Sequence, residues 1–434
     1  MNLGYPTGRG ILMRLSFPFG HDNQVLDIPD SSLLGVLRSG INGYTPLADP
    51  VSLVRQALEN PVGSKRLSEL SEGKKKVVII CSDHTRPVPS KVIIPQMLSE
   101  IRKGNPDAEI TLLISTGCHR RTTRAELESK FGKEIVDSET IVIHACDNSP
   151  MVNLGRLPSG GELIVNALVT SADLVCSEGF IEPHFFAGFS GGRKSVLPGI
   201  ASRITVMANH CSEFIADSHS RTGILDGNNI HKDMVWAARR VGLAFICNVV
   251  INAEKEVIYA VSGDMEKAHE KGCEFLSKLC AVKALPADIA ISTNGGYPLD
   301  QNIYQSVKGM TAAEATVRQG GIIIMIAACN DGHGGESFFR QIADASSLEK
   351  ATEEILARGR NQTIPDQWEA QILLRILMKA TVILVSKAPD DMVRAMHMIP
   401  ASDLKTAMDM AHEILGKSDA TVTAIPDGVS VMVV

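Results

Sequence analysis

The sequence predicts an α/β protein of two lobes with largely parallel sheets and with the active site in the cleft between the lobes. Three observations support this prediction. Short β-branched runs alternate with segments of helical spacing, which is typical of parallel strands joined by crossover helices. The 434 residues exceed what one hydrophobic core usually serves. Polar, glycine-rich segments follow the predicted strands, at the edge where open α/β sheets bind their ligands.

The first series of strands indicates a first lobe that spans residues 1–280. A helix is expected over Val92–Lys103, between the first two strands of this series. Because strand and helix alternate, we expect neighbouring strands to run in the same direction. The expected strands are Lys76–Cys81, Glu109–Ser115, Thr140–Cys146, Asp173–Ser177 and Leu243–Ile251.

A second series of strands and helices indicates a second lobe that spans residues 281–434. The stretch Lys278–Ala287, which contains Pro286, is the expected join between the lobes. The expected elements of this lobe are the strands Asp288–Ser292, Gly321–Ala328 and Thr381–Ser386 and the helices Thr311–Arg318 and Ala370–Lys379.

Composition limits the class of protein. Hydrophobic residues make up 44% and charged residues 21%, which is ordinary for a globular chain. The net charge of -6 gives no general attraction to nucleic acid or to an anionic membrane. Nine scattered cysteines without a C-x-x-C pair argue against a disulfide framework and a thiolate zinc site. With no signal-peptide pattern and no long apolar run, we expect a cytoplasmic protein.

Five polar loops follow predicted strands, and we expect them to converge on one cleft because the carboxyl ends of parallel strands share one edge. The loops are SDHTRPVPS after 76–81, TGCHR after 109–115, EGFIEPH after 173–177, NGGYPLDQN after 288–292 and NDGHGGE after 321–328.

The loop SDHTRPVPS allows two interpretations. Arg86 offers a planar fork for a carboxylate or a phosphate. Alternatively, Asp83 or Thr85 caps a helix that begins near Pro89, and Asp83 forms a structural pair with Arg86. The loop by itself does not favour one interpretation over the other.

The segment AGFSGGRKSVLPG, residues 187–199, resembles a phosphate-binding loop but does not match its pattern. The pattern G-x-x-x-x-G-K-[ST] requires a glycine where Arg193 stands. What remains is a flexible glycine-rich loop that presents Arg193 and Lys194, to bind an anion or to use Lys194 as a nucleophile. Two solvated cations on a turn are the alternative.

Three histidines are candidates for chemistry. His119 and His184 stand in loops after strands, and His210 follows the helix-like segment SRITVMANH. No H-x-x-x-H or H-E-x-x-H spacing is present, so the sequence shows no local metal motif. Each histidine taken alone could be a hydrogen-bonded structural residue, whereas two of them on facing loops would suit acid/base chemistry.

The segment DQNIYQSVKGM, residues 300–310, opens a predicted helix in the second lobe. Gln301, Gln305 and Lys308 stand at helical intervals on one side of it. It is either a solvated amphipathic helix or a set of polar groups that closes over a ligand of the first lobe.

Taken together, several long motifs resemble the lactate racemases that use a nickel-pincer nucleotide. The resemblance extends over nearly the whole chain and is weakest in the first fifty residues. The motifs, in order, are SDHTRPVPS, TGCHR, EGFIEPHFFAGFSGGRKSVLPGIAS, MANH, STNGGYPLDQNIYQSVKGMTAAEAT, DGHGGE and IPDQW.

The resemblance implies a cofactor and its protein contacts. The cofactor would be a nickel(II) pyridinium-3,5-bisthiocarboxylic acid mononucleotide, attached in some members of the family to the lysine that corresponds to Lys194. His210 would be the protein's nickel ligand, which would need no second protein ligand nearby. Asp83, His84 and Thr85 would line the cofactor side of their loop.

The resemblance also implies residues that act on the substrate. His119 and His184 would be the acid/base pair, and Arg86 would bind the substrate carboxylate. Gln305 and Lys308 would contact the substrate, with Tyr304 and Trp368 as walls that help to exclude water.

The implied function is that of an isomerase, a lactate racemase that interconverts L- and D-lactate by reversible hydride transfer through a 2-keto acid. Its partners would be a small 2-hydroxy acid and the enzymes that make the cofactor.

Cys118 is smaller than the residue expected before the catalytic histidine, so a larger acid such as malate, phenyllactate or gluconate is the alternative. A second alternative is a nucleotide-binding protein without turnover. A nicotinamide dehydrogenase is disfavoured because no G-x-G-x-x-G fingerprint is present.

Overall fold

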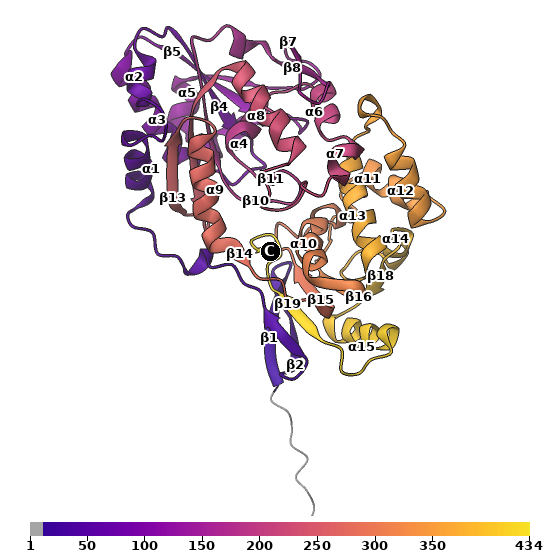
Figure 1. Ribbon diagram of the computed structural model, residues 1–434. Coiled ribbons are helices and arrows are strands. Elements are labelled where there is room, and N and C mark those ends of the chain that lie inside the picture. The colour runs from indigo at the N-terminus through magenta and orange to yellow at the C-terminus, as the bar shows by residue number, and fades with distance from the viewer. Residues whose placement is uncertain (1–11) are drawn as a thin grey trace, which may run out of the picture. The chain divides into compact units, whose positions relative to one another are not determined.

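The computed structural model describes residues 12–434, which form two compact units (Figure 1). The N unit comprises residues 40–279 and 358–364, and the C unit comprises residues 12–39, 280–357 and 365–434. The break after residue 279 lies inside the join expected at Lys278–Ala287. The units differ from the expected lobes because the first described residues belong to the C unit and a short later segment belongs to the N unit.

The N unit is built on a six-stranded sheet with the order β13-β12-β9-β4-β5-β6. Its strands are parallel except for β13, which runs antiparallel to β12. The chain order reverses between β4 and β9, and such a switch point is where doubly wound sheets bind ligands at the carboxyl ends of their strands. The strands are β4 (Lys76–Ser82), β5 (Glu109–Ser115), β6 (Thr140–Ile143), β9 (Leu174–Phe180), β12 (Leu243–Ile251) and β13 (Val257–Gly263).

Helices cover the faces of this sheet. Alternate residues of β4, such as Val77 and Ile79, pack in one core cluster with the first helices of the unit, whereas Val78 and Ile80 face the other side and are also buried. Burial on both faces explains why β4 appears in the sequence as a continuous apolar run. The helices are α1 (Pro50–Glu59), α2 (Leu67–Ser71), α3 (Ser90–Gly104), α4 (Arg124–Phe131), α5 (Lys133–Ser138), α6 (Arg203–Asn209), α7 (Ser212–Ala216), α8 (Asn229–Val241) and α9 (Lys267–Cys280).

The C unit contains a six-stranded sheet in which all the pairs are parallel, with the order β18-β17-β16-β15-β19-β3. The edge strand β3 comes from the N-terminal part of the chain and pairs with β19. The strands are β3 (Leu33–Val36), β15 (Ala287–Thr293), β16 (Val317–Ile326), β17 (Thr381–Val385), β18 (Ile399–Ala401) and β19 (Val422–Ile425).

Two elements cover one face of the C-unit sheet, namely α15 (Leu404–Leu415) and the hairpin of β1 (Leu12–Phe19) and β2 (Asp22–Pro29) (Figure 1). Phe17, Phe19 and Ile28 of the hairpin lie in the core of this unit, which explains why the start of the chain belongs to it. The other helices of the unit are α10 (Ile303–Thr316), α11 (Glu336–Ala343), α12 (Leu348–Leu356), α13 (Gln367–Lys379) and α14 (Asp390–Ala395).

The fold class predicted from the sequence, α/β with largely parallel sheets, is confirmed. Several element predictions were wrong in part. The strand expected over Asp173–Ser177 runs on to Phe180, so Glu178 lies in β9 and not in the loop after it. The strand expected over Gly321–Ala328 spans Val317–Ile326. The strand expected over Thr140–Cys146 ends at Ile143, because the chain turns there and Ala145 donates its N–H to the Ser149 hydroxyl. The helix expected over Thr311–Arg318 spans Ile303–Thr316, and Val317 already begins β16.

No helix among residues 12–434 combines the length and the apolar character that a membrane crossing requires.

The position of Phe17 predicts that the N-terminal hairpin stabilises the C unit. Phe17 is fully buried in the C-unit core, so Phe17→Ala should lower the free energy of unfolding of this unit by about 3–5 kcal/mol. In a Trp236→Phe background, urea unfolding followed by Trp368 fluorescence reports the C unit. Met13→Ala is the matched control, because Met13 lies on the same strand and is 41% exposed. Equal stability of the two variants would contradict the assignment of the hairpin to this core.

Candidate active site

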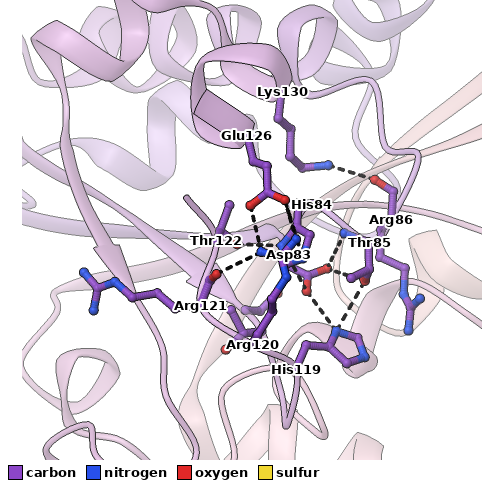
Figure 2. Close-up of polar contacts among 12 residues, drawn as sticks. Asp83, His84, Thr85, Arg86, His119, Arg120, Arg121, Thr122, Glu126 and Lys130 are labelled. Carbon is purple, nitrogen blue, oxygen red and sulfur yellow. Dashed lines mark hydrogen bonds and ion pairs between the residues drawn. The ribbon is translucent and has the colours of Figure 1, made fainter. Parts of the chain in front are cut away.

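The loop between β4 and α3 is organised around the carboxylate of Asp83 (Figure 2). Asp83 Oδ1 accepts hydrogen bonds from the Thr85 hydroxyl at 2.7 Å and the Thr85 N–H at 3.2 Å, and Oδ2 lies 2.8 Å from His119 Nδ1. Burial by itself raises the pKa of Asp83, but the hydrogen bonds from His119 and Thr85 outweigh it, so the pKa is lowered. Asp83 is therefore ionised at neutral pH and holds the His119 ring in place.

This arrangement sets the tautomer of His119. A carboxylate accepts, so the neutral His119 ring carries its proton on Nδ1 and keeps a lone pair on Nε2. The His119 side chain is 42% exposed. His119 is thus arranged as a base whose reactive nitrogen is oriented by Asp83.

The other residues of the loop have different surroundings. His84 Nδ1 lies 3.0 Å from the Thr122 hydroxyl, and its Nε2 lies 4.0 Å from Glu126 (Figure 2). Arg86 is exposed, and its guanidinium makes no hydrogen bond or ion pair with any residue from 12 to 434. Arg86 is therefore available for an external anion.

The alternative interpretation of this loop was wrong about the cap and about a direct side-chain pair, although the charge of Arg86 contributes to the lowered pKa of Asp83. The N-cap of α3 is Pro89, and no side chain caps that helix. Asp83 and Arg86 are joined by a backbone hydrogen bond of 3.3 Å rather than by their side chains. The Asp83 carboxylate is used instead by Thr85 and His119, because the loop after β5 brings His119 to it.

The second candidate histidine lies in a tight hairpin. His184 belongs to β10 (Pro183–His184), which pairs with β11 (Gly188–Phe189). His184 Nδ1 accepts a hydrogen bond of 3.3 Å from the Ala187 N–H, so the neutral ring carries its proton on Nε2. The two histidines thus have opposite tautomers, and His184 can accept a proton only if the long Ala187 contact breaks.

Phe186 brings His184 together with Lys194 and His210. Its ring centroid lies 4.5 Å from that of His184, 5.2 Å from that of His210 and 5.7 Å from Lys194 Nζ. His210 is the C-cap residue that follows α6, and it is 5% exposed. Burial and then the charge of Lys194 lower the pKa of His210 to about 3, so its imidazole is neutral at ordinary pH.

The glycine-rich loop is more ordered than the sequence suggested. Arg193 is 1% exposed and donates to the carbonyl oxygens of Phe189 and Ala187, each at 2.8 Å, and to His231 Nδ1 at 3.0 Å. The prediction that Arg193 is presented on a flexible loop, or solvated, was therefore wrong. Lys194 is partly buried, and its Nζ lies beside the ring of Phe186.

Glycines at two positions allow close contacts between the glycine-rich loop and its neighbours. Gly192 has a φ of +52°, and a Cβ there would lie 2.8 Å from the His269 ring. Its N–H donates to the side chain of Asn248 on β12 at 2.7 Å. The Gly117 N–H donates to the Gly199 carbonyl at 2.9 Å, which joins the loop that carries His119 to the segment after Lys194.

The remaining candidates lie in the C unit. Tyr304, Gln305 and Lys308 stand on α10, and Lys308 Nζ donates to Gln305 Oε1 at 2.6 Å. Tyr304 lies close to Asp366 and Trp368 at the start of α13, and burial and then the charges of Glu369 and Asp366 raise its pKa. Gln301 precedes α10, so it does not share a helical face with Gln305 as expected.

Several other residues with structural roles in the two units were not identified from the sequence. Glu178 is the acidic residue of the otherwise apolar and small run LVCSEGF, and that contrast was the available signal. Glu369, next to Trp368, is 1% exposed, and burial raises its pKa. Lys130 and Phe186 gave no signal in the sequence. Among residues 12–434 no three His, Cys, Asp or Glu side chains are grouped as a metal site.

Comparisons with known proteins extend over nearly the whole chain. Residues 19–223 match the family model of the lactate racemase N-terminal domain, and residues 282–433 match that of the lactate racemase C-terminal domain. A lactate racemase of Thermoanaerobacterium thermosaccharolyticum is 52% identical over 97% of this chain and 99% of its own length. A lactate racemase of Lactiplantibacillus plantarum is 51% identical over 97% of this chain and 100% of its own length.

Solved structures give the same picture. The lactate racemase apoprotein from Thermoanaerobacterium thermosaccharolyticum superposes with a TM-score of 0.93 at 51% identity, covering 97% of this chain and all of that one. A protein from Thermotoga maritima shares the fold with a TM-score of 0.62 at 21% identity, over 89% of this chain and 99% of that one.

The contact between Arg193 and His231 predicts a pH dependence of stability. Burial, and then the charge of Arg193, lower the pKa of His231 to about 3. Below pH 6.5 the unfolded chain binds a proton at this histidine that the folded chain does not bind, so stability falls as the pH falls. When the pH is lowered from 7 to 5, the free energy of unfolding should fall by about 2 kcal/mol less in the His231→Asn variant than in the unchanged chain.

Urea unfolding in a Trp368→Phe background measures this effect, because Trp236 on α8 then reports the N unit. Equal losses with and without His231 would show that this histidine is not held neutral by its surroundings.

Proposed function

This chain belongs to the lactate racemase family, and from that membership we propose that it is an isomerase that interconverts L- and D-lactate with a bound nickel-pincer nucleotide. The observation that carries the proposal is the extent of the similarity. Both halves of the chain match, and two lactate racemases are about half identical to it over nearly their full lengths. Similarity confined to one domain would have supported the fold but not the reaction.

The residues around Phe186 fit the proposed cofactor. A histidine must be neutral to bind a metal, and the lowered pKa of His210 satisfies this requirement. Lys194 lies near the same aromatic ring, which supports its role as the residue that attaches the nucleotide. When bound, the cofactor supplies a centre that accepts the hydrogen of the substrate α-carbon as hydride, and so leaves a 2-keto acid.

The residues around Asp83 fit the binding of a 2-hydroxy acid. The exposed Arg86 guanidinium binds the carboxylate, where a planar fork can make two parallel hydrogen bonds. His119, oriented by Asp83, takes the proton of the substrate hydroxyl at Nε2. In the resting tautomer His184 hydrogen-bonds the substrate oxygen through its Nε2–H. After the Ala187 contact breaks and the ring carries its proton on Nδ1, Nε2 can take the hydroxyl proton of the other enantiomer, and the resulting imidazolium returns that proton when the reaction runs in reverse. Gln305 and Lys308 contact the substrate, and Tyr304 and Trp368 form walls that exclude water.

A racemisation assay tests the proposed reaction. The protein is produced together with the cofactor-making enzymes and nickel, and the loss of optical purity is followed for L- and D-lactate. We expect inversion of both, with malate, phenyllactate and gluconate as the comparison set. Inversion of a comparison acid alone would favour the larger-substrate alternative that Cys118 suggests. No inversion of any acid by a nickel-containing preparation would favour a nucleotide-binding protein without turnover.

The two histidines should be needed for turnover but not for nickel. His119→Ala and His184→Ala should each lower the racemisation rate by at least about a hundredfold, because each removes one of the two groups that exchange a proton with the substrate oxygen. Metal analysis should find as much nickel in these variants as in the unchanged enzyme. His219→Ala is the control, since the His219 side chain is exposed and its ring pairs with Asp217 and not with any residue of the proposed site. Normal activity in either variant would remove that histidine from the acid/base pair.

A further inference from the structure

A buried carboxylate accepts hydrogen bonds from both ends of the loop that carries Asp83 and Arg86. Glu178 lies on β9, next to β4, and is 3% exposed. Its Oε1 accepts hydrogen bonds from the Ser82 N–H at 3.2 Å, the Ser82 hydroxyl at 3.0 Å and the Ser90 hydroxyl at 2.8 Å. Ser82 ends β4 and Ser90 begins α3, so one carboxylate oxygen ties together the two ends of the loop.

An ammonium group holds the middle of the same loop. Lys130, in the last turn of α4, donates from Nζ to the carbonyl oxygen of Arg86 at 3.0 Å and to that of Val88 at 3.3 Å (Figure 2). The bonds go to the main chain, so they restrain the backbone that carries the Arg86 side chain and leave its guanidinium available.

The two groups also depend on each other electrostatically. Burial raises the pKa of Glu178 and lowers that of Lys130, while the charge of each opposes the shift of the other. Removal of one partner therefore leaves the other as a poorly compensated charge in a site of low polarity.

We propose that Glu178 and Lys130 are positioning residues for Arg86, which hold the loop 82–90 in the one geometry in which its guanidinium can bind the substrate carboxylate. This inference rests on the role proposed above for Arg86. It assigns two residues outside the substrate-contacting set to substrate affinity. They act through the backbone and touch neither the substrate nor the cofactor.

The first test needs no cofactor and no activity. Hydrogen exchange of the loop 82–90 should become at least about tenfold faster in Lys130→Met, because two charge-assisted hydrogen bonds are lost. Exchange in β5 and in α8 should stay unchanged. Lys278→Met is the matched control, since Lys278 forms an exposed pair with Glu274 on α9. Glu178→Gln, which keeps the side-chain size, should also speed exchange of the loop. Unchanged exchange in both Lys130→Met and Glu178→Gln would overturn the proposal.

The second test separates positioning from general stability. Lys130→Met should raise the KM for lactate about tenfold with a smaller change in kcat, and Lys130→Arg should restore most of the affinity. In the Arg86→Gln background, Lys130→Met should change KM no further, because its effect passes through Arg86. If Lys130→Met raised KM by the same factor in the Arg86→Gln background as in the unchanged enzyme, the proposal would be overturned. If the unchanged enzyme inverts no acid, the proposed function fails, and the exchange experiment still decides whether the two residues hold the loop.

Discussion

The parallel pairing of β4 with β9 is the constraint on which the candidate site depends. The pairing sets Ile80 opposite Ser177, so the next residue, Glu178, reaches the Ser82 end of β4 and the Ser90 start of α3. On its other side β4 pairs with β5, and the loop after β5 brings His119 to Asp83. The order of the three adjacent strands β9, β4 and β5 thus brings the loop after β4, Glu178 and His119 together at one edge of the sheet.

Buried charge explains why these loops have one conformation. Ionised groups inside a protein are tolerated when hydrogen bonds surround them, and those bonds restrain the backbone that supplies them. Asp83 collects its bonds from Thr85 and His119, and Arg193 collects carbonyl oxygens and imidazole nitrogens. In this way the hydrogen bonds of Arg193 restrain the loop that carries Lys194, and those of Asp83 restrain the loop that carries Arg86.

The fold could be predicted where the pattern is local. Strands buried on both faces appear as continuous apolar runs, and the bounds of Glu109–Ser115 and Leu243–Ile251 agree with the structure. Membership of a unit could not be predicted in this way. The pairing of β3 with β19 joins residues nearly four hundred positions apart, so no window of the sequence contains both strands.

The sequence by itself determined the order of strands and loops, the types of polar side chain in each loop and, through its long motifs, the family. Only the tertiary structure decided which of two adjacent cations is buried: Arg193 is enclosed, whereas Lys194 lies beside Phe186. The Arg193 partners His231 and His269 are 38 and 76 residues away in the chain. Likewise, Glu178 meets Ser82 and Ser90 across 96 and 88 residues. The burial of a polar group depends on such distant partners, which a local sequence pattern does not contain.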